Sequence, residues 1–278
     1  MPRFVDSDDP IVADLLMSTI ELVAEAGGWI APSTTFVSRN GQLHVESTEK
    51  EGNPLLHIPS TAFIRVDDVT WGNDPDRLEI LEINHDLGEL ELELLYIQVA
   101  LHNQTQKLTW MSTTHPWLAP NLPKEVIEAV RLLLPTFRTP EMTTSDTLWA
   151  NRCFRIALDT ESQPQRLLIP LVDLLNHHNR GATGSWAGNA FDVAAVMPFG
   201  SQECALNYGI NRDHLEMAAV YGFIDSSDAI TIKRAGTSAM NHELLEALID
   251  ACSHYPTLEA CNILGGGAKL QMQKLIKS

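Results

Sequence analysis

The residue types best suited to chemistry in this sequence are the amide and imidazoles of Asn176-His177-His178, which end the apolar run PLVDLL. Adjacent histidines suggest a metal site, because neutral imidazole is a common metal ligand. No further His, Asp or Glu follows at ligand spacing, so we expect no bound metal. Taken alone, the three residues are more typical of a polar turn at a helix end than of a catalytic site.

Two tyrosines downstream stand beside glycines. Tyr208 ends the strand-like run CALNY and precedes Gly209, and Tyr221 opens the run Tyr-Gly-Phe. A phenol at a strand end can face a channel and donate or accept a hydrogen bond there. A strand tyrosine by itself is more often part of the core, and for Tyr221 core packing against Phe223 is a nearly equal alternative.

These motifs occur together in one known family. Read with the upstream runs WANRCF and EGNPLLHIP, they resemble the SET-domain methyltransferases, in the branch that includes the Rubisco large-subunit lysine methyltransferase and the actin-histidine methyltransferase. The resemblance extends from about Trp29 to Asp225. It rests on a proline-led PLxDxxNH, a GxE turn, a strand ending in Tyr-Gly and a helix ending in Tyr-Gly-Phe, which here are Pro170 to His177, Gly200 with Glu203, Tyr208-Gly209 and Tyr221-Gly222-Phe223.

The resemblance implies S-adenosylmethionine as cofactor and assigns the site residues. Tyr208 and Tyr221 would line the channel for the methyl acceptor, with Tyr208 the residue on which transfer most depends. The cofactor would lie against Asn176, His177, Arg152, Arg39, Gly41 and Leu43, with Arg152 pairing with its carboxylate. The family's Gly-x-Gly-Leu loop aligns with Asn40 to Leu43, where both expected glycines are replaced, by Asn40 and Gln42.

Methyl transfer of this kind needs a neutral amine in line with a methyl group on a sulfonium, so the protein mainly supplies alignment and a dipolar site. A lysine has a reference pKa of roughly 10.4, and an apolar aromatic channel favours loss of its proton. The resemblance therefore implies a protein N-methyltransferase, with lysine favoured over histidine as acceptor. Two alternatives stay open, a catalytically silent SET fold that binds a peptide or protein, and a small-molecule N-methyltransferase.

Charge and cysteine content limit the kinds of partner and the cellular compartment that we expect for this protein. The formal net charge of −17, from 36 acidic and 19 basic residues, opposes nucleic-acid binding and favours a basic protein or peptide substrate. Four cysteines without a CxxC pair predict free thiols in a reducing compartment. The N-terminal run MPRFVDSDDP lacks the pattern of a secretion signal, and no apolar stretch is long enough to span a membrane. We therefore expect a soluble, intracellular protein, in the cytoplasm.

The elements that must position these residues alternate in type along the chain. Asp9 as a cap and Pro10 in the first turn predict an amphipathic helix that ends at Gly27-Gly28. Short β-type runs broken at Asn40-Gly41 follow from Trp29 to about Val66, and helical spacing then extends to Leu158. Strand-like patterns occur again in the runs AFDVAAVMPF and CALNY.

This order predicts an α+β fold of small sheets in a discontinuous SET domain over residues 1–225. Its parts are residues 29–66, a helical insert at 67–158, and residues 159–225 that return to the first sheet region. A short helical extension is expected at 226–278.

Overall fold

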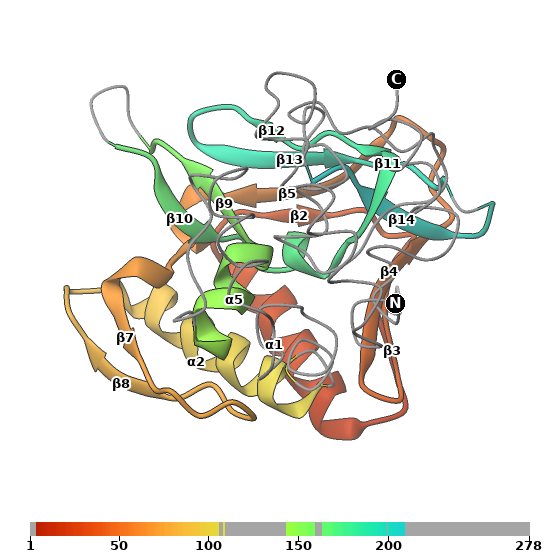
Figure 1. Ribbon diagram of the computed structural model, residues 1–278. Coiled ribbons are helices and arrows are strands. Elements are labelled where there is room, and N and C mark those ends of the chain that lie inside the picture. Colours follow the sequence, from red (N-terminus) through yellow and green to blue (C-terminus); the bar gives the residue numbers. More distant parts are fainter. Residues whose placement is uncertain (1–3, 106–107, 109–142, 159–162, 199, 209–278) are drawn as a thin grey trace, which may run out of the picture. The chain divides into compact units, whose positions relative to one another are not determined.

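A computed structural model describes residues 4–105, 108, 143–158, 163–198 and 200–208 of the chain. By its internal contacts the chain divides into two compact units, residues 1–108 with 152–210, and residues 109–151 with 211–278. The described strands, which Figure 1 labels, all fall within the residue ranges of the first unit. Tyr221 and the predicted extension at 226–278 lie outside the described residues.

The first helix, α1 (Pro10–Glu25), forms as its capping signals predict. The Asp9 carboxylate accepts a hydrogen bond from the Ile11 backbone N–H at 2.8 Å, and proline occupies the first turn, where it removes no needed donor. The helix ends before Gly27, whose φ of 89° reverses the chain at little steric cost.

A five-stranded sheet joins the beginning of the chain to its later part. The order is β1-β3-β4-β14-β11, so strands from before residue 48 pair with strands from after residue 175. β14 pairs antiparallel with β4 and parallel with β11 (Figure 1). The bounds are β1 (Val5–Ser7), β3 (Thr34–Arg39), β4 (Gln42–Ser47), β14 (Glu203–Leu206) and β11 (Asn176–Ala182).

Two further sheets also pair strands from the early part of the chain with strands from its later part. One has the order β12-β13-β5-β2 and the other the order β6-β10-β9. Their strands are β12 (Ser185–Trp186), β13 (Ala190–Ala194), β5 (Pro54–Pro59), β2 (Trp29–Ile30), β6 (Ile64–Arg65), β10 (Gln165–Leu168) and β9 (Cys153–Ile156). Because residues 29–65 pair with residues 165–206 in all three sheets, the prediction of an α+β fold with a discontinuous β-rich part is confirmed.

The segment predicted as a helical insert contains both helices and strands. Helices α2 (Glu89–Gln104) and α5 (Thr144–Arg152) form as expected, but Val69–Trp71 (β7) and Ile80–Ile83 (β8) make an antiparallel hairpin. The expectation of helix is also wrong for β9, which begins one residue after α5 and pairs with β10. Cys153–Ile156 has the β-branched and aromatic character that a half-buried strand favours, and partners distant in sequence decide the outcome.

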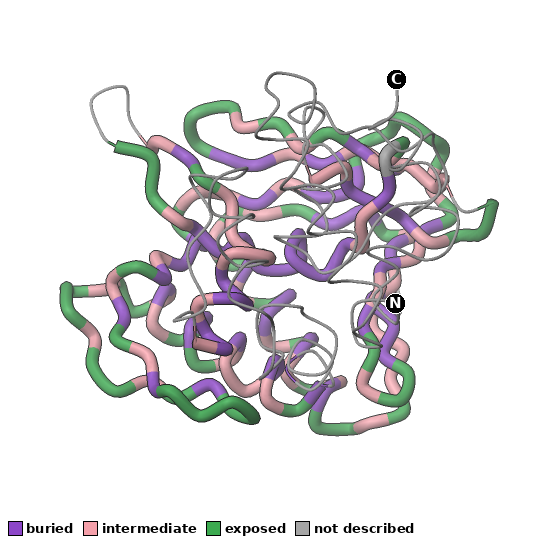
Figure 2. Tube along the Cα trace, viewed as in Figure 1, coloured by how far each residue is buried: buried purple, intermediate pink, exposed green. Residues whose placement is uncertain are grey.

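The core of the first unit lies between the helices α1 and α2 and the sheets. Apolar side chains of both helices, such as Leu16 and Leu94, are fully buried, as are Phe36 and Leu56 on the sheets. Buried positions recur along both the helices and the strands (Figure 2). Burial of such side chains is the main stabilising contribution to a fold of this size. None of the helices in the described ranges combines the length and hydropathy needed to cross a membrane.

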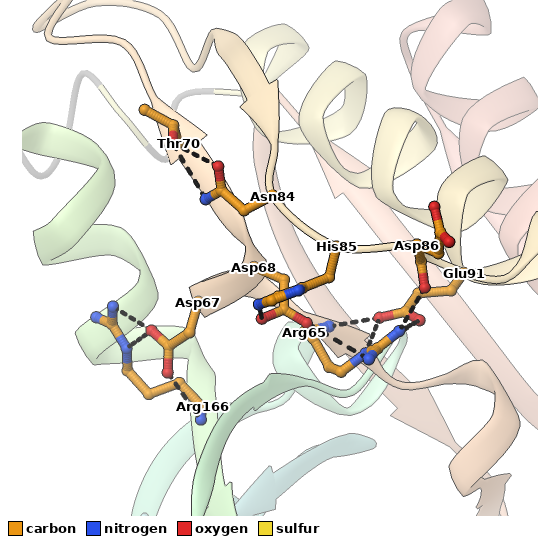
Figure 3. Close-up of polar contacts among 9 residues, drawn as sticks. All are labelled: Arg65, Asp67, Asp68, Thr70, Asn84, His85, Asp86, Glu91 and Arg166. Carbon is orange, nitrogen blue, oxygen red and sulfur yellow. Dashed lines mark hydrogen bonds and ion pairs between the residues drawn. The ribbon is translucent and has the colours of Figure 1, made fainter.

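A polar network ties the start of α2 to the strands beside it. Arg65 binds Glu91 through its side chain, with Nη2 to Oε2 at 2.8 Å, and its backbone N–H donates to the same carboxylate at 2.9 Å (Figure 3). Asp68 lies 3.4 Å from Arg65, and Asp67 accepts from Arg166 Nε at 2.6 Å. The short helix η2 (Val66–Asp68) is thereby held between α2 and β10.

Candidate functional site

The run that opens the candidate site is a turn followed by a strand. Pro170 and Leu171 lead into the 3-10 helix η4 (Val172–Leu174), and β11 begins at Asn176. Leu171 has a φ of 70°, an unusual value for a residue with a branched side chain, and it is completely buried. Strained backbone of this kind persists where the surrounding packing enforces it, and it recurs at functional sites.

Parallel pairing of β11 with β14 brings the two halves of the motif together. Asn176 lies opposite Ala205 and His177 opposite Leu206, and Tyr208 follows two residues beyond Leu206. Because side chains alternate along a strand, Asn176 and His177 point to opposite faces of the sheet. The structure therefore gives these neighbours different partners.

Asn176 contacts an acidic residue on one face. Its Nδ2 donates to Glu203 Oε1 at 2.8 Å, so the amide orientation is defined. Glu203 begins β14 and lies opposite Glu46 of β4. The predicted GxE turn thus supplies a carboxylate that holds the amide of the NH motif.

His177 and Tyr208 contact each other on the other face. The Tyr208 backbone N–H donates to His177 Nδ1 at 3.1 Å, and the two ring centroids are 5.0 Å apart. Since Nδ1 accepts this bond, the neutral imidazole carries its proton on Nε2. His177 therefore has a structural role, as the acceptor for the Tyr208 backbone N–H, in addition to any role in binding.

The Tyr208 phenol is oriented by the turn that precedes β11. Its hydroxyl donates to the Leu175 carbonyl oxygen at 2.7 Å. Burial raises the pKa of Tyr208, the positive charge of Arg152 lowers it, and the negative charge of Asp173 raises it again. The hydroxyl is consequently neutral at physiological pH, and it keeps the proton that it donates to Leu175 while its oxygen can still accept a hydrogen bond.

Arg152 lies at the junction of α5 and β9 and contacts the same turn. Its Nη1 donates to the Asp173 carbonyl oxygen at 2.8 Å. Its Nε is buried and has no hydrogen-bond partner among the residues that the structure describes. A buried guanidinium nitrogen without a partner is energetically costly, and an anionic ligand group would compensate for it.

The predicted cofactor loop is a tight β-hairpin. Asn40 and Gly41 have φ values of 50° and 74°, as a two-residue type I′ turn requires, and Arg39 pairs with Gln42 across it. Positive φ therefore falls on Asn40 and Gly41, and Gln42 occupies an ordinary strand position. Leu43 is buried, on the same face of β4 as Val45.

Polar groups of the hairpin are engaged with the N-terminal segment. Arg39 Nη1 donates to the Asp6 carbonyl oxygen at 2.8 Å, and its guanidinium pairs with the Asp6 carboxylate. The Asn40 N–H donates to Asp8 Oδ2 at 2.8 Å. Since β4 is antiparallel to β14, the hairpin end of β4 and the Tyr208 end of β14 lie toward the same end of the sheet.

The structure therefore gathers four of the predicted residues around η4, β11 and β14, namely Arg152, Asn176, His177 and Tyr208. The residues Arg39, Gly41 and Leu43 are on the neighbouring strand pair, and Tyr221 lies outside the described ranges. Sequence reasoning missed His102 of α2, whose Nε2 is 3.5 Å from Asp173 Oδ2 with both side chains fully buried. No local signal marks a histidine that pairs across 71 positions of the chain.

The second histidine of the motif has a local role. His178 Nδ1 accepts the Arg180 backbone N–H at 3.0 Å, and the residue is buried. Within the described part of the chain, no group of three or more His, Cys, Asp or Glu side chains is arranged to hold a metal ion.

Comparison with known proteins finds similarity among solved structures. No protein-family model and no curated protein matches the chain. The SET domain of LSMT bound to lysine and AdoHcy matches with 13% identity and a TM-score of 0.46, over 96% of this chain and 91% of that chain. Rubisco LSMT bound to AdoMet matches with 13% identity and a TM-score of 0.48, over 95% of this chain and 91% of that chain. The complex of Rubisco LSMT with sinefungin and monomethyllysine gives 13% identity and a TM-score of 0.47, over 97% and 91%.

Proposed function

We propose that this chain is an S-adenosylmethionine-dependent protein N-methyltransferase of the SET type, acting on a lysine side chain. The observation that carries the proposal is the parallel pairing of β11 with β14. It joins the NH motif at Asn176-His177 to Tyr208, two segments that the sequence separates by about 30 residues. Pairing of these particular motifs is the feature by which the sequence resembles the SET methyltransferases.

The residues present fit a nucleotide cofactor that carries a carboxylate. Arg152 is anchored through Nη1 on the Asp173 carbonyl oxygen, while its Nε has no partner in the described part of the molecule. We assign this guanidinium to the cofactor carboxylate, and Asn176, His177 and the hairpin Arg39–Leu43 to the remaining cofactor contacts. When bound, S-adenosylmethionine would supply a methyl group on a positively charged sulfur.

The chain's own contribution to transfer is alignment. The Tyr208 hydroxyl is neutral and already held at 2.7 Å from the Leu175 carbonyl oxygen, so little reorganisation is needed to present its oxygen to an incoming amine. An amine that donates a hydrogen bond to this oxygen is held in one orientation relative to the methyl group, with its lone pair free for attack. Tyr221 would form a second wall of the channel.

The acceptor that we favour is lysine in a basic protein segment. The net charge of −17 attracts such a segment and repels polyanions. A lysine that enters an apolar site loses its proton more readily than in water, because burial disfavours the charged form. The neutral amine is the nucleophile that the reaction requires.

A second candidate is a SET fold that binds a peptide or protein without catalysis. Contacts of the hairpin favour it, because Arg39 and Asn40 are bonded to Asp6 and Asp8, and these groups would have to exchange partners to contact a cofactor. This candidate predicts a folded protein with no measurable affinity for S-adenosylmethionine.

Isothermal titration calorimetry with S-adenosylmethionine separates the two candidates. The methyltransferase proposal predicts saturable binding that Asn176→Ala weakens at least tenfold, since the variant loses the amide and releases Glu203. Asn84→Ala is the matched control, because it removes an exposed amide whose hydrogen bonds, within the described part of the chain, are made to Thr70 in the hairpin β7–β8. Binding that Asn176→Ala leaves unchanged would refute the cofactor placement, and no binding by the wild type would favour the silent module.

A further inference from the structure

The turn η4 beside the candidate site contributes one member of a buried histidine–aspartate pair. His102, in the last turn of α2, has its Nε2 at 3.5 Å from Asp173 Oδ2, and neither side chain is exposed. Asp173 is the middle residue of η4, the turn that leads to Asn176. Burying a histidine–aspartate pair costs desolvation free energy, so a contribution to stability alone does not account for the pair at this position.

The turn that carries Asp173 is fixed at three points. At its start, Leu171 is fully buried with a φ of 70°. In its middle, the Asp173 carbonyl oxygen accepts from Arg152 while the carboxylate faces His102. At its end, the Leu175 carbonyl oxygen accepts from the Tyr208 hydroxyl at 2.7 Å.

We infer that Asp173 and His102 act as a positioning pair, which holds η4 so that Arg152, Asn176 and the Tyr208 hydroxyl keep their places in the site. This inference rests on the proposed function for what the site does. The pair acts through the backbone of the turn, whose two carbonyl oxygens orient the Arg152 guanidinium and the Tyr208 phenol.

The charged groups around the pair make its effect measurable. Arg152, Asp173 and the His177 ring are polar neighbours of Tyr208, as is the Leu175 carbonyl oxygen. Burial raises the pKa of the Cys153 thiol, and the negative charge of Asp173 raises it further. Replacing Asp173 by Asn removes one negative charge without changing side-chain size. The pKa of Tyr208 should therefore fall in this variant, since the charge that opposes the phenolate is gone.

The principal test compares Asp173→Asn with Glu91→Gln in the full chain. Glu91→Gln is a matched control, because it neutralises another largely buried carboxylate of the same unit. Glu91 lies on α2, the helix that also carries His102, and it pairs with Arg65 (Figure 3). Amide hydrogen exchange is followed at Leu174, Leu175 and Tyr208, whose N–H groups bond within the turn and to His177. Tyr208 is titrated by NMR with carbon-labelled tyrosine and is assigned from the spectrum of Tyr208→Phe.

We expect exchange at these three amides to accelerate at least tenfold in Asp173→Asn relative to Glu91→Gln, with a lower pKa of Tyr208 in the first variant alone. The double variant His102→Gln/Asp173→Asn supplies two neutral amides that can hydrogen-bond to each other, and it should recover part of the lost protection. Equal exchange and equal Tyr208 titration in Asp173→Asn and Glu91→Gln would overturn the inference. If Asp173→Asn does not fold, a double variant that folds supports the pairing, and a double variant that also fails to fold overturns it.

Calorimetry with S-adenosylmethionine separates this inference from the proposed function. A weaker affinity in Asp173→Asn, kept in Glu91→Gln, supports both. A wild-type chain that does not bind the cofactor refutes the proposed function, and the exchange and titration results then decide the positioning role independently.

Discussion

Removing the Tyr208 hydroxyl is the sharpest test of the proposed catalytic role. Tyr208→Phe keeps the ring and its contact with the His177 ring, whose centroid is 5.0 Å away. It deletes a donor that is 2.7 Å from the Leu175 carbonyl oxygen. The variant therefore removes the hydrogen bond to Leu175 and leaves the backbone bond from the Tyr208 N–H to His177 in place.

The same hydroxyl contributes to stability and to rate, and the two magnitudes can be estimated separately. Leu175 is fully buried, so losing its donor leaves a buried acceptor unsatisfied, at a cost of about 1–3 kcal/mol. Domains of ordinary stability unfold with about 5–15 kcal/mol, so the variant stays folded. Loss of one preorganised polar contact lowers the transfer rate on the order of 100-fold, which the small unfolded fraction cannot explain.

The assay uses the transfer of a labelled methyl group from S-adenosylmethionine to proteins of a cell extract, followed by the same reaction on the substrate so identified. Calorimetry first shows that Tyr208→Phe still binds the cofactor. Tyr96→Phe is the matched control, because Tyr96 lies on α2 with 53% of its surface exposed. Methylation at the wild-type rate by a cofactor-loaded Tyr208→Phe would refute the catalytic assignment.

Three other variants test the structure around the site. Gly41→Val should lower the free energy of unfolding by about 1–3 kcal/mol in urea, because Gly41 has a φ of 74°, and Gln42→Val should have little effect; equal losses would contradict the type I′ turn. Burial raises the pKa of the Cys204 thiol from 9.0 to about 11, so above pH 9 the unfolded chain releases this proton first and the folded state loses stability. Cys204→Ala should therefore lose less unfolding free energy than the wild type between pH 9 and pH 11, and identical pH profiles would rule out this source of alkaline instability. Asp9→Ala should lower the melting temperature and Asp9→Asn should largely preserve it, as the carboxylate caps α1 through the Ile11 N–H; equal melting of both variants would argue against the cap.

Local signals in the sequence were sufficient for several elements. Asp9 and Pro10 predict the start of α1, and Asn40-Gly41 predicts a turn between two β-type runs, because these residue types satisfy capping and positive-φ requirements within a few positions of the chain. The alternation of β-type and helical segments along the sequence also predicted the discontinuous α+β arrangement. Such features depend on neighbouring residues and on hydrophobic pattern, which the sequence displays directly.

Tertiary pairing decided the elements with weak local preference. Cys153–Ile156 continues a helical pattern in the sequence, yet it forms β9 because β10 offers an antiparallel partner. Val69–Trp71 and Ile80–Ile83 likewise form a hairpin where helix was expected. Hydrogen bonds and burial supplied by distant residues outweigh propensities, which amount to fractions of a kcal/mol per residue.

In the candidate site, too, some features could be predicted from the sequence and others depend on the tertiary structure. The motifs identified Asn176, His177 and Tyr208 as a group, because their types and order resemble a known pattern. The sequence could not show that Asn176 and His177 lie on opposite faces of β11, since that depends on whether the segment is a turn or a strand. Nor could it show that His102 faces Asp173, because the pairing of two buried side chains across 71 positions exists only once α2 and η4 have packed together.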